Sequence, residues 1–229
     1  MSGTGVSNSS GHKQSFVLAN TSGNASFLFF EGDSANAGNN INAGSSIQYT
    51  QVGGSGIGAA GSAISFDDVS GTTATAGSAI FINNGGTASS AGGGSVSFEA
   101  SSTAGTATFT NNPGTSGGSG GFTEFDSTST AGSAHITNNG SATLGAYGLT
   151  IFSAIFASTG RATAGNATIT NNGGTASGAD GGHTFFQSTD ATRFSTAGNA
   201  LITNNGGTAS GATGGVTEFD GNSTAGSAI

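Results

Sequence analysis

The acidic residues that follow inward-facing phenylalanines are the first candidates for chemistry in this sequence. Asp67, Glu99 and Asp126 each come directly after a Phe at corresponding places in successive repeats. In a stack of parallel strands they would lie about 5 Å apart on one outer face, and carboxylate oxygens are the ligands that Ca²⁺ prefers. The alternative, which we favour, is a solvated acidic stripe without a metal. We therefore expect no cofactor, with Ca²⁺ at this row as the alternative.

Residues for catalysis are scarce. Acid–base chemistry on glycans needs clustered carboxylates or other titratable groups, but only 6% of the residues are charged. Asp67 and Asp68 are the only adjacent acidic pair, and neighbours in a strand point to opposite faces. We predict a protein without catalytic or cofactor-binding residues, and a carbohydrate-binding or carbohydrate-active β-helix remains the alternative.

The elements that position these residues come from a repeat. Residues 162–182 read ATAGNATITNNGGTASGADGG and residues 195–215 read STAGNALITNNGGTASGATGG, which differ at three of 21 positions. Looser copies begin near residues 73, 102 and 129, and a last one stops within its motif at Ile229. Repeats of this length are typical of stacked arrays, in which each unit buries its apolar side only against its neighbours.

Within each copy, a two-residue alternation indicates a strand with one buried face. The inward apolar residue is followed two places later by an asparagine, and these asparagines would form a hydrogen-bonded ladder along the stack: Asn83, Asn111, Asn138, Asn171 and Asn204. A short second face of small residues follows. A third extended segment would supply an internal stack of aromatic rings: Phe98, Phe125, Phe152, Phe186 and Phe219.

Three short extended faces separated by glycine-rich corners predict an all-β fold, a single-stranded parallel β-helix (β-solenoid). We expect about seven rungs of 27–33 residues and a right-handed course. Residues 1–70 would form degenerate N-terminal rungs, and residues 71–229 the regular repeats, truncated at the C-terminus. The alternative is a flexible low-complexity tract, since 44 of the 229 residues are Gly. The regular return of Phe, Ile and Asn argues against that alternative.

Charge and composition restrict the partners. The net charge of −8 argues against nucleic acid, which is bound through Lys and Arg. No apolar run approaches the roughly 20 residues of a membrane-spanning helix, so we expect no membrane insertion by this segment. An outward threonine row (Thr110, Thr137, Thr170, Thr203) makes ice binding a further alternative, but the column beside it is mixed, with His135 and Leu201.

The segment FDSTSTAGSAHITNNG, which begins at Phe125, and its neighbours resemble the repeats of large bacterial autotransporter-type and filamentous-adhesin-type surface proteins. The resemblance covers residues 70–229 and implies a secreted right-handed β-helix at the bacterial cell surface, often adhesive. It supplies no catalytic residues. We therefore expect a non-catalytic, extracellular structural or adhesive segment that contacts a host or environmental surface, either a glycan or a protein. End-to-end self-association through the terminal rungs is also expected, because a cut rung leaves unpaired backbone groups.

Overall fold

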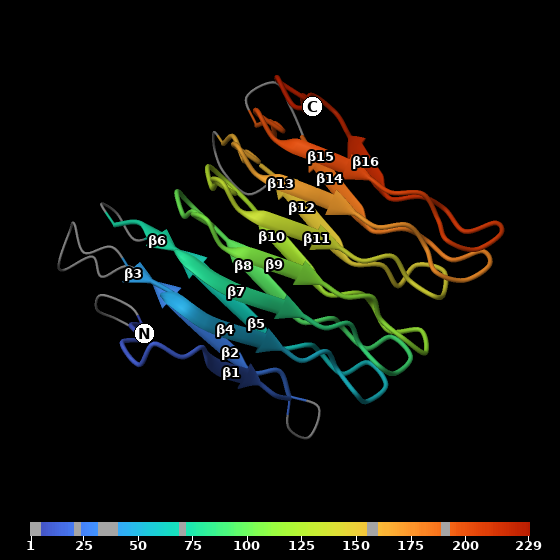
Figure 1. The fold of residues 1–229 in the computed structure, drawn as a ribbon, viewed down its shortest axis with the longest axis horizontal. Coiled ribbons are helices and arrows are strands. Elements are labelled where there is room, and N and C mark those ends of the chain that lie inside the picture. Colours follow the sequence, from blue (N-terminus) through green and yellow to red (C-terminus); the bar gives the residue numbers. More distant parts are fainter. Residues whose placement is uncertain (1–5, 21–23, 32–40, 69–71, 155–159, 189–192) are drawn as a thin grey trace.

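The computed structural model describes residues 6–20, 24–31, 41–68, 72–154, 160–188 and 193–229. Two parallel sheets of seven strands each run along the molecule, and Figure 1 shows them stacked as successive coils. The first sheet contains, in spatial order, β1 (Gln14–Leu18), β4 (Ser45–Gln51), β7 (Ser78–Asn83), β9 (Thr108–Asn111), β11 (His135–Asn138), β13 (Thr168–Asn171) and β15 (Leu201–Asn204).

The second sheet contains the alternate strands of the chain. These are β2 (Phe27–Glu31), β5 (Ala63–Asp67), β8 (Ser95–Phe98), β10 (Phe122–Phe125), β12 (Leu149–Ser153), β14 (His183–Gln187) and β16 (Val216–Phe219). The predicted parallel β-helix with about seven rungs is therefore confirmed. The first 70 residues contribute β1 to β5, of which β1, β2, β4 and β5 extend the same two sheets.

The register follows the sequence repeat without a slip across the regular copies. Ile136 pairs with Ile169, and Ile169 pairs with Ile202, as expected from their place in each copy. In β11 the burial alternates, with His135 exposed, Ile136 buried, Thr137 half-buried and Asn138 buried. The two-residue period thus turns one face of each strand to the core and the other face outward.

Two columns of rings lie between the sheets, one along the whole second sheet and one on the first sheet that gives way to isoleucine after Phe109. On the second sheet, rings in adjacent rungs stack in parallel, with centroids 4.8 Å apart for Phe98–Phe125 and for Phe125–Phe152. On the first sheet, Phe81 stacks on Phe109 at 4.9 Å. The columns meet edge to face, as where Phe98 and Phe109 cross at 79°. Offset stacks and edge-to-face contacts are the favoured arrangements of aromatic pairs.

Of the three predicted faces, only the one with the ladder asparagines and the one with the stacked phenylalanines are sheets along the whole stack. A different, thin face lies at the Thr-Ala-Gly segments and consists of the two-residue pair of β3 (Ile41–Asn42) with β6 (Ala74–Thr75) and of single-residue bridges. The bridged threonines are Thr75, Thr103, Thr130, Thr163, Thr196 and Thr224. In each complete copy the alanine after this threonine is buried, so the face is too thin to hold larger side chains.

The small-residue segments form loops instead of a second face. They connect each strand of the first sheet to the next strand of the second, and they project together from one side of the solenoid (Figure 1). The two arms of one loop touch through their backbones: a Cβ on Gly174 would lie 2.4 Å from the carbonyl oxygen of Ala179. Neighbouring loops also bond through their backbones, as from the Thr208 N–H to the Gly174 oxygen at 2.9 Å.

Candidate functional site

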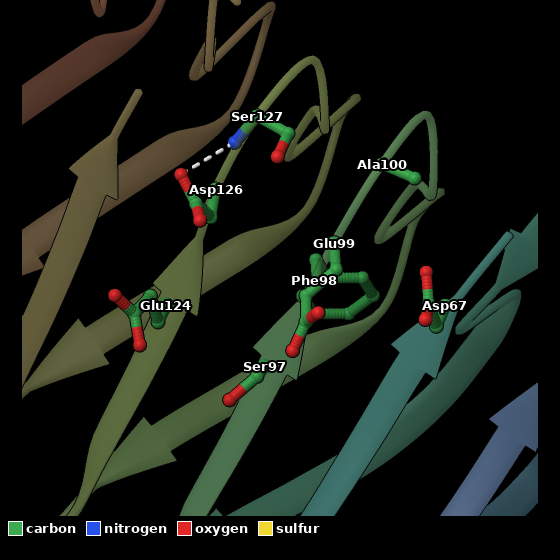
Figure 2. Close-up of a pocket in the computed structure, with 8 residues that line it drawn as sticks. All are labelled: Asp67, Ser97, Phe98, Glu99, Ala100, Glu124, Asp126 and Ser127. Carbon is green, nitrogen blue, oxygen red and sulfur yellow. Dashed lines mark hydrogen bonds between the residues drawn. The ribbon is translucent and has the colours of Figure 1, made fainter. Parts of the chain in front are cut away.

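The acidic row lies where strands of the second sheet end. Phe66, Phe98 and Phe125 are paired across β5, β8 and β10, so the following residues Asp67, Glu99 and Asp126 continue the column. Figure 2 shows their carboxylates along the ends of the three strands, with Glu124 beside them on β10. Together with Ser97, Phe98, Ala100 and Ser127 they line a cavity of about 340 Å³.

Two further carboxylates extend the row beyond the predicted residues. Glu31 is paired with Asp67 between β2 and β5, and Glu124 lies two residues before Asp126 on the outer face of β10. The signals were present in the sequence. Glu31 follows Phe30 as Asp67 follows Phe66, and Glu124 occupies the outward place in the alternation FTEF.

Burial and mutual repulsion shape the electrostatics of the row. Burial is the largest cause that raises the pKa of Asp67, Glu99 and Glu124. The neighbouring carboxylates add to it: Asp67 and Asp126 both raise the pKa of Glu99. Because burial and neighbouring charges disfavour their ionised forms, Asp67, Glu99 and Glu124 hold protons more tightly than isolated carboxylates would.

The adjacent residue Asp68 has a structural role. Its carboxylate accepts a hydrogen bond from the backbone N–H of Ala74 and another from the hydroxyl of Ser101. These contacts tie the turn after β5 to the next rung. Among the residues that the structure describes, no group of three or more His, Asp or Glu side chains is arranged to hold a metal ion. The row therefore offers negative charge and oxygen atoms without a formed coordination cage.

The five ladder asparagines form a continuous internal chain of amides. The Nδ2 of each donates to the Oδ1 of the next at 2.7–2.8 Å, from Asn83 through Asn111, Asn138 and Asn171 to Asn204. Asn111 shows how fully such an amide is used: its Nδ2 also donates to the Leu149 oxygen, and its Oδ1 also accepts from Thr123 Oγ1. The amides of Asn111, Asn138 and Asn171 hold the rungs together and have no capacity left for a ligand.

A second ladder, which the sequence reasoning missed, lies one residue further along each copy. Asn84, Asn112, Asn139, Asn172 and Asn205 are linked in the opposite direction, with each Nδ2 donating to the Oδ1 of the preceding rung at 2.8–3.0 Å. The alternation places these side chains outward, and they are half-buried or exposed. We call this the outer ladder. The Asn-Asn pair in each copy was the signal that could have revealed it.

The outward threonines form a column beside the outer ladder. Thr110, Thr137, Thr170 and Thr203 are paired in register from β9 to β15. The neighbouring column on the same outer face lies two residues earlier on each strand. It holds Ile80, Thr108, His135, Thr168 and Leu201, likewise in register. The predicted threonine row is therefore regular, and its neighbour is chemically mixed.

Comparison with protein-family models, with curated proteins and with solved structures found no match for this chain. In the described part of the chain, no helix is long and apolar enough to cross a membrane.

Proposed function

We propose that this chain is a non-catalytic structural and adhesive β-solenoid segment of a bacterial surface or secreted protein. The observation that carries the proposal is the register-matched outer face of the first sheet, whose strands from β7 to β15 carry no Asp, Glu, Lys or Arg. Four threonines and five asparagines repeat along it at the spacing of one rung, about 4.8 Å. Such a rigid, periodic array of polar groups suits contact with an extended surface.

The arrangement of titratable groups supports a non-catalytic role. Neighbouring carboxylates of the acidic row repel one another. Asp68, which forms the adjacent acidic pair with Asp67, is hydrogen-bonded to Ala74 and Ser101. A glycosidase needs one carboxylic acid and one carboxylate on the two sides of the bond to be cleaved, whereas Glu31, Asp67, Glu99 and Asp126 lie in one column along the ends of neighbouring strands. We propose that the acidic row is a solvated stripe that needs no cofactor, and that its charge limits aggregation.

Labelling of intact cells tests the location and the adhesive role. An antibody raised against the purified chain should label intact cells of the source organism, and added protease should remove the signal. Beads coated with the chain should adhere to environmental or host surfaces more than beads coated with albumin. Labelling only after cell lysis would contradict the proposal.

Activity assays test the non-enzymatic part separately. Incubation of the chain with a polysaccharide panel should release neither reducing ends nor unsaturated sugars. Release that is abolished by Asp67→Asn or Asp68→Asn would instead establish an enzyme.

A further inference from the structure

An uncharged groove runs along the base of the projecting loops on the side of the first sheet. It consists of two adjoining cavities of about 370 and 620 Å³, which share Pro113 in their walls. All five asparagines of the outer ladder line it, together with threonines of the loops: Thr87, Thr175 and Thr208. The remaining lining residues are Gly, Ser and Val, so the groove carries no charged side chain.

The outer ladder has hydrogen-bonding capacity that the inner ladder lacks. An asparagine amide has two N–H donors and two acceptor positions on its oxygen. Asn139 uses one donor to Asn112 and one acceptor position from Asn172. The inner amide of Asn111, in contrast, makes two further bonds to Leu149 and Thr123. Asn112, Asn139 and Asn172, which line the groove, therefore each keep one unused donor and one unused acceptor position, and the end members Asn84 and Asn205 keep one more.

From this arrangement we propose that the groove binds a linear, neutral polysaccharide lying along the solenoid axis. The proposal rests on the adhesive function proposed above and names the chemical class of the receptor. A neutral glycan repeats hydroxyl groups that both donate and accept, and these match the unused N–H and oxygen positions of successive amides. The groove lacks the cationic side chains that would select an anionic glycan, and the net charge of −8 opposes polyanions.

A bulky side chain at the mouth of the groove provides the test. Thr175 is exposed and lines the groove, and its hydroxyl donates to the Ser141 oxygen of the preceding rung at 3.0 Å. Thr128 is a matched control. It is also exposed, and its hydroxyl donates to the Ala100 oxygen of the preceding rung at 2.8 Å, on the turn after β10 and away from the groove.

Co-sedimentation of the purified chain with insoluble cellulose, chitin and β-1,3-glucan measures binding, with pectate and heparin resins as anionic comparisons. We expect wild type to bind at least one neutral glycan and to bind the anionic resins no better than albumin does. Thr175→Trp should weaken that binding about tenfold or more, while Thr128→Trp and Thr175→Ser should bind as wild type does. Melting temperatures of both Trp variants equal to that of wild type show that the fold is intact.

Several outcomes would overturn the inference. Three of them are binding results: no binding to any neutral glycan, unchanged binding by Thr175→Trp, or a preference for the anionic resins. The fourth is thermal hysteresis of the wild-type chain that Thr175→Trp abolishes, which would show that the groove binds ice. Adhesion of chain-coated beads to protein surfaces, without glycan binding, would reject this inference and leave the proposed function standing. If the chain binds glycan but intact cells do not display it, the proposed surface function is rejected and this inference stands.

Discussion

At the scale of single residues, the inner ladder has one imperfect place. Gln51 is paired with Asn83 in the register of β4 and β7 and is fully buried. Neither amide atom of Gln51 has a hydrogen-bond partner among the described residues, nor does the Oδ1 of Asn83. A buried polar atom left without a partner costs about 1–3 kcal/mol. The longer side chain thus interrupts a ladder that the backbone register would continue.

Gln51→Asn should therefore stabilise the protein. A shorter amide at this place can donate to Asn83 Oδ1, which removes unpaired buried groups, and we expect a gain of about 1–2 kcal/mol in the free energy of unfolding. Urea denaturation followed by circular dichroism measures it. The reverse change in the middle of the ladder, Asn138→Gln, should destabilise the protein. A loss of stability in Gln51→Asn would show that the glutamine side chain fills a space that asparagine leaves empty.

The acidic row predicts that mild acid stabilises this fold. The pKa values of Asp67, Glu99 and Glu124 are raised in the folded state, above their ordinary values near 4. The folded protein therefore binds these protons more tightly than the unfolded chain does. Their contribution to stability is fully present below those ordinary values, and it is lost as the pH rises through the raised folded values.

Glu124→Gln tests the row, because burial is the main cause of the raised pKa of Glu124 and the mutation removes the charge. The variant should be more stable than wild type at pH 7, and the difference should shrink toward pH 4. Chemical denaturation at a series of pH values measures both. Burial lowers the pKa of His183, so acidification near pH 6 lowers the stability of the fold through this group. Each variant is therefore compared with wild type at the same pH. Glu218→Gln, at the register-equivalent place on β16, should leave the contribution of the row unchanged.

Sequence patterns predicted those columns of residues whose position can be read from the alternation within a single strand. The inner ladder asparagines and the stacked phenylalanines repeat at fixed offsets, and a parallel stack converts equal offsets into contacts. The threonine partners of the ladder were not predictable in this way. Thr123 bonds to Asn111 from the opposite sheet, and its column holds Val96 in the preceding rung. No single-strand pattern distinguishes such a threonine from an ordinary polar residue.

At the scale of elements, the corner between rungs depends on a threonine and a glycine two residues later. The Thr163 hydroxyl accepts the Gly165 N–H at 3.0 Å, and the same bond recurs in the neighbouring copies, as from Gly132 to Thr130. Gly165 has a φ of +61°, and a Cβ there would lie 2.8 Å from the Gly132 oxygen. The corner therefore needs glycine for its backbone conformation and for the closeness of the next rung.

Gly165→Ala and Gly178→Ala separate these two requirements. Gly178 has a φ of +72° at the tip of a projecting loop, and a Cβ there would meet nothing within 4 Å. Both substitutions strain the backbone by about 1–2 kcal/mol, but only Gly165→Ala also forces two rungs apart. We expect it to cost about 1–3 kcal/mol more than Gly178→Ala in the free energy of unfolding, measured by urea denaturation. Equal costs would mean that the corner adjusts to admit a methyl group.

The projecting loops show where element prediction failed. Their sequences contain Gly, Ala, Ser and Thr without an apolar alternation, so the pattern could not distinguish a thin strand from two loop arms in backbone contact. Glycine is compatible with a thin strand and with two loop arms in backbone contact. The decisive feature is the approach of one arm to the other, such as that of Gly174 to Ala179. It joins residues whose types carry no signal of pairing.

At the scale of the whole molecule, the core changes character along the axis. At the place of the inner ladder, the N-terminal rungs carry Leu18 and then Gln51, whereas the later rungs carry asparagine. The facing column on the second sheet changes from Leu28, Ile64 and Val96 to threonine at 123, 150, 184 and 217. At these two facing columns, apolar side chains thus give way to hydrogen-bonded ones, and the two changes lie within two rungs of each other, while the phenylalanine stack continues to Phe219.

Because each rung contacts only its neighbours, the cost of a core substitution should depend on its place in the stack. Phe125 is fully buried and stacks on Phe98 and Phe152 at 4.8 Å, whereas Phe219 stacks on Phe186 alone and is 39% exposed. Phe125→Ala should cost about 3–5 kcal/mol, as for other buried phenylalanines, and Phe219→Ala should cost less than half as much. Urea denaturation compares the two. Amide hydrogen exchange should show that Phe125→Ala weakens protection first in β10 and its neighbours β8 and β12, while β5 keeps its protection. A uniform loss along the whole stack would contradict nearest-neighbour coupling and would make the solenoid one cooperative unit.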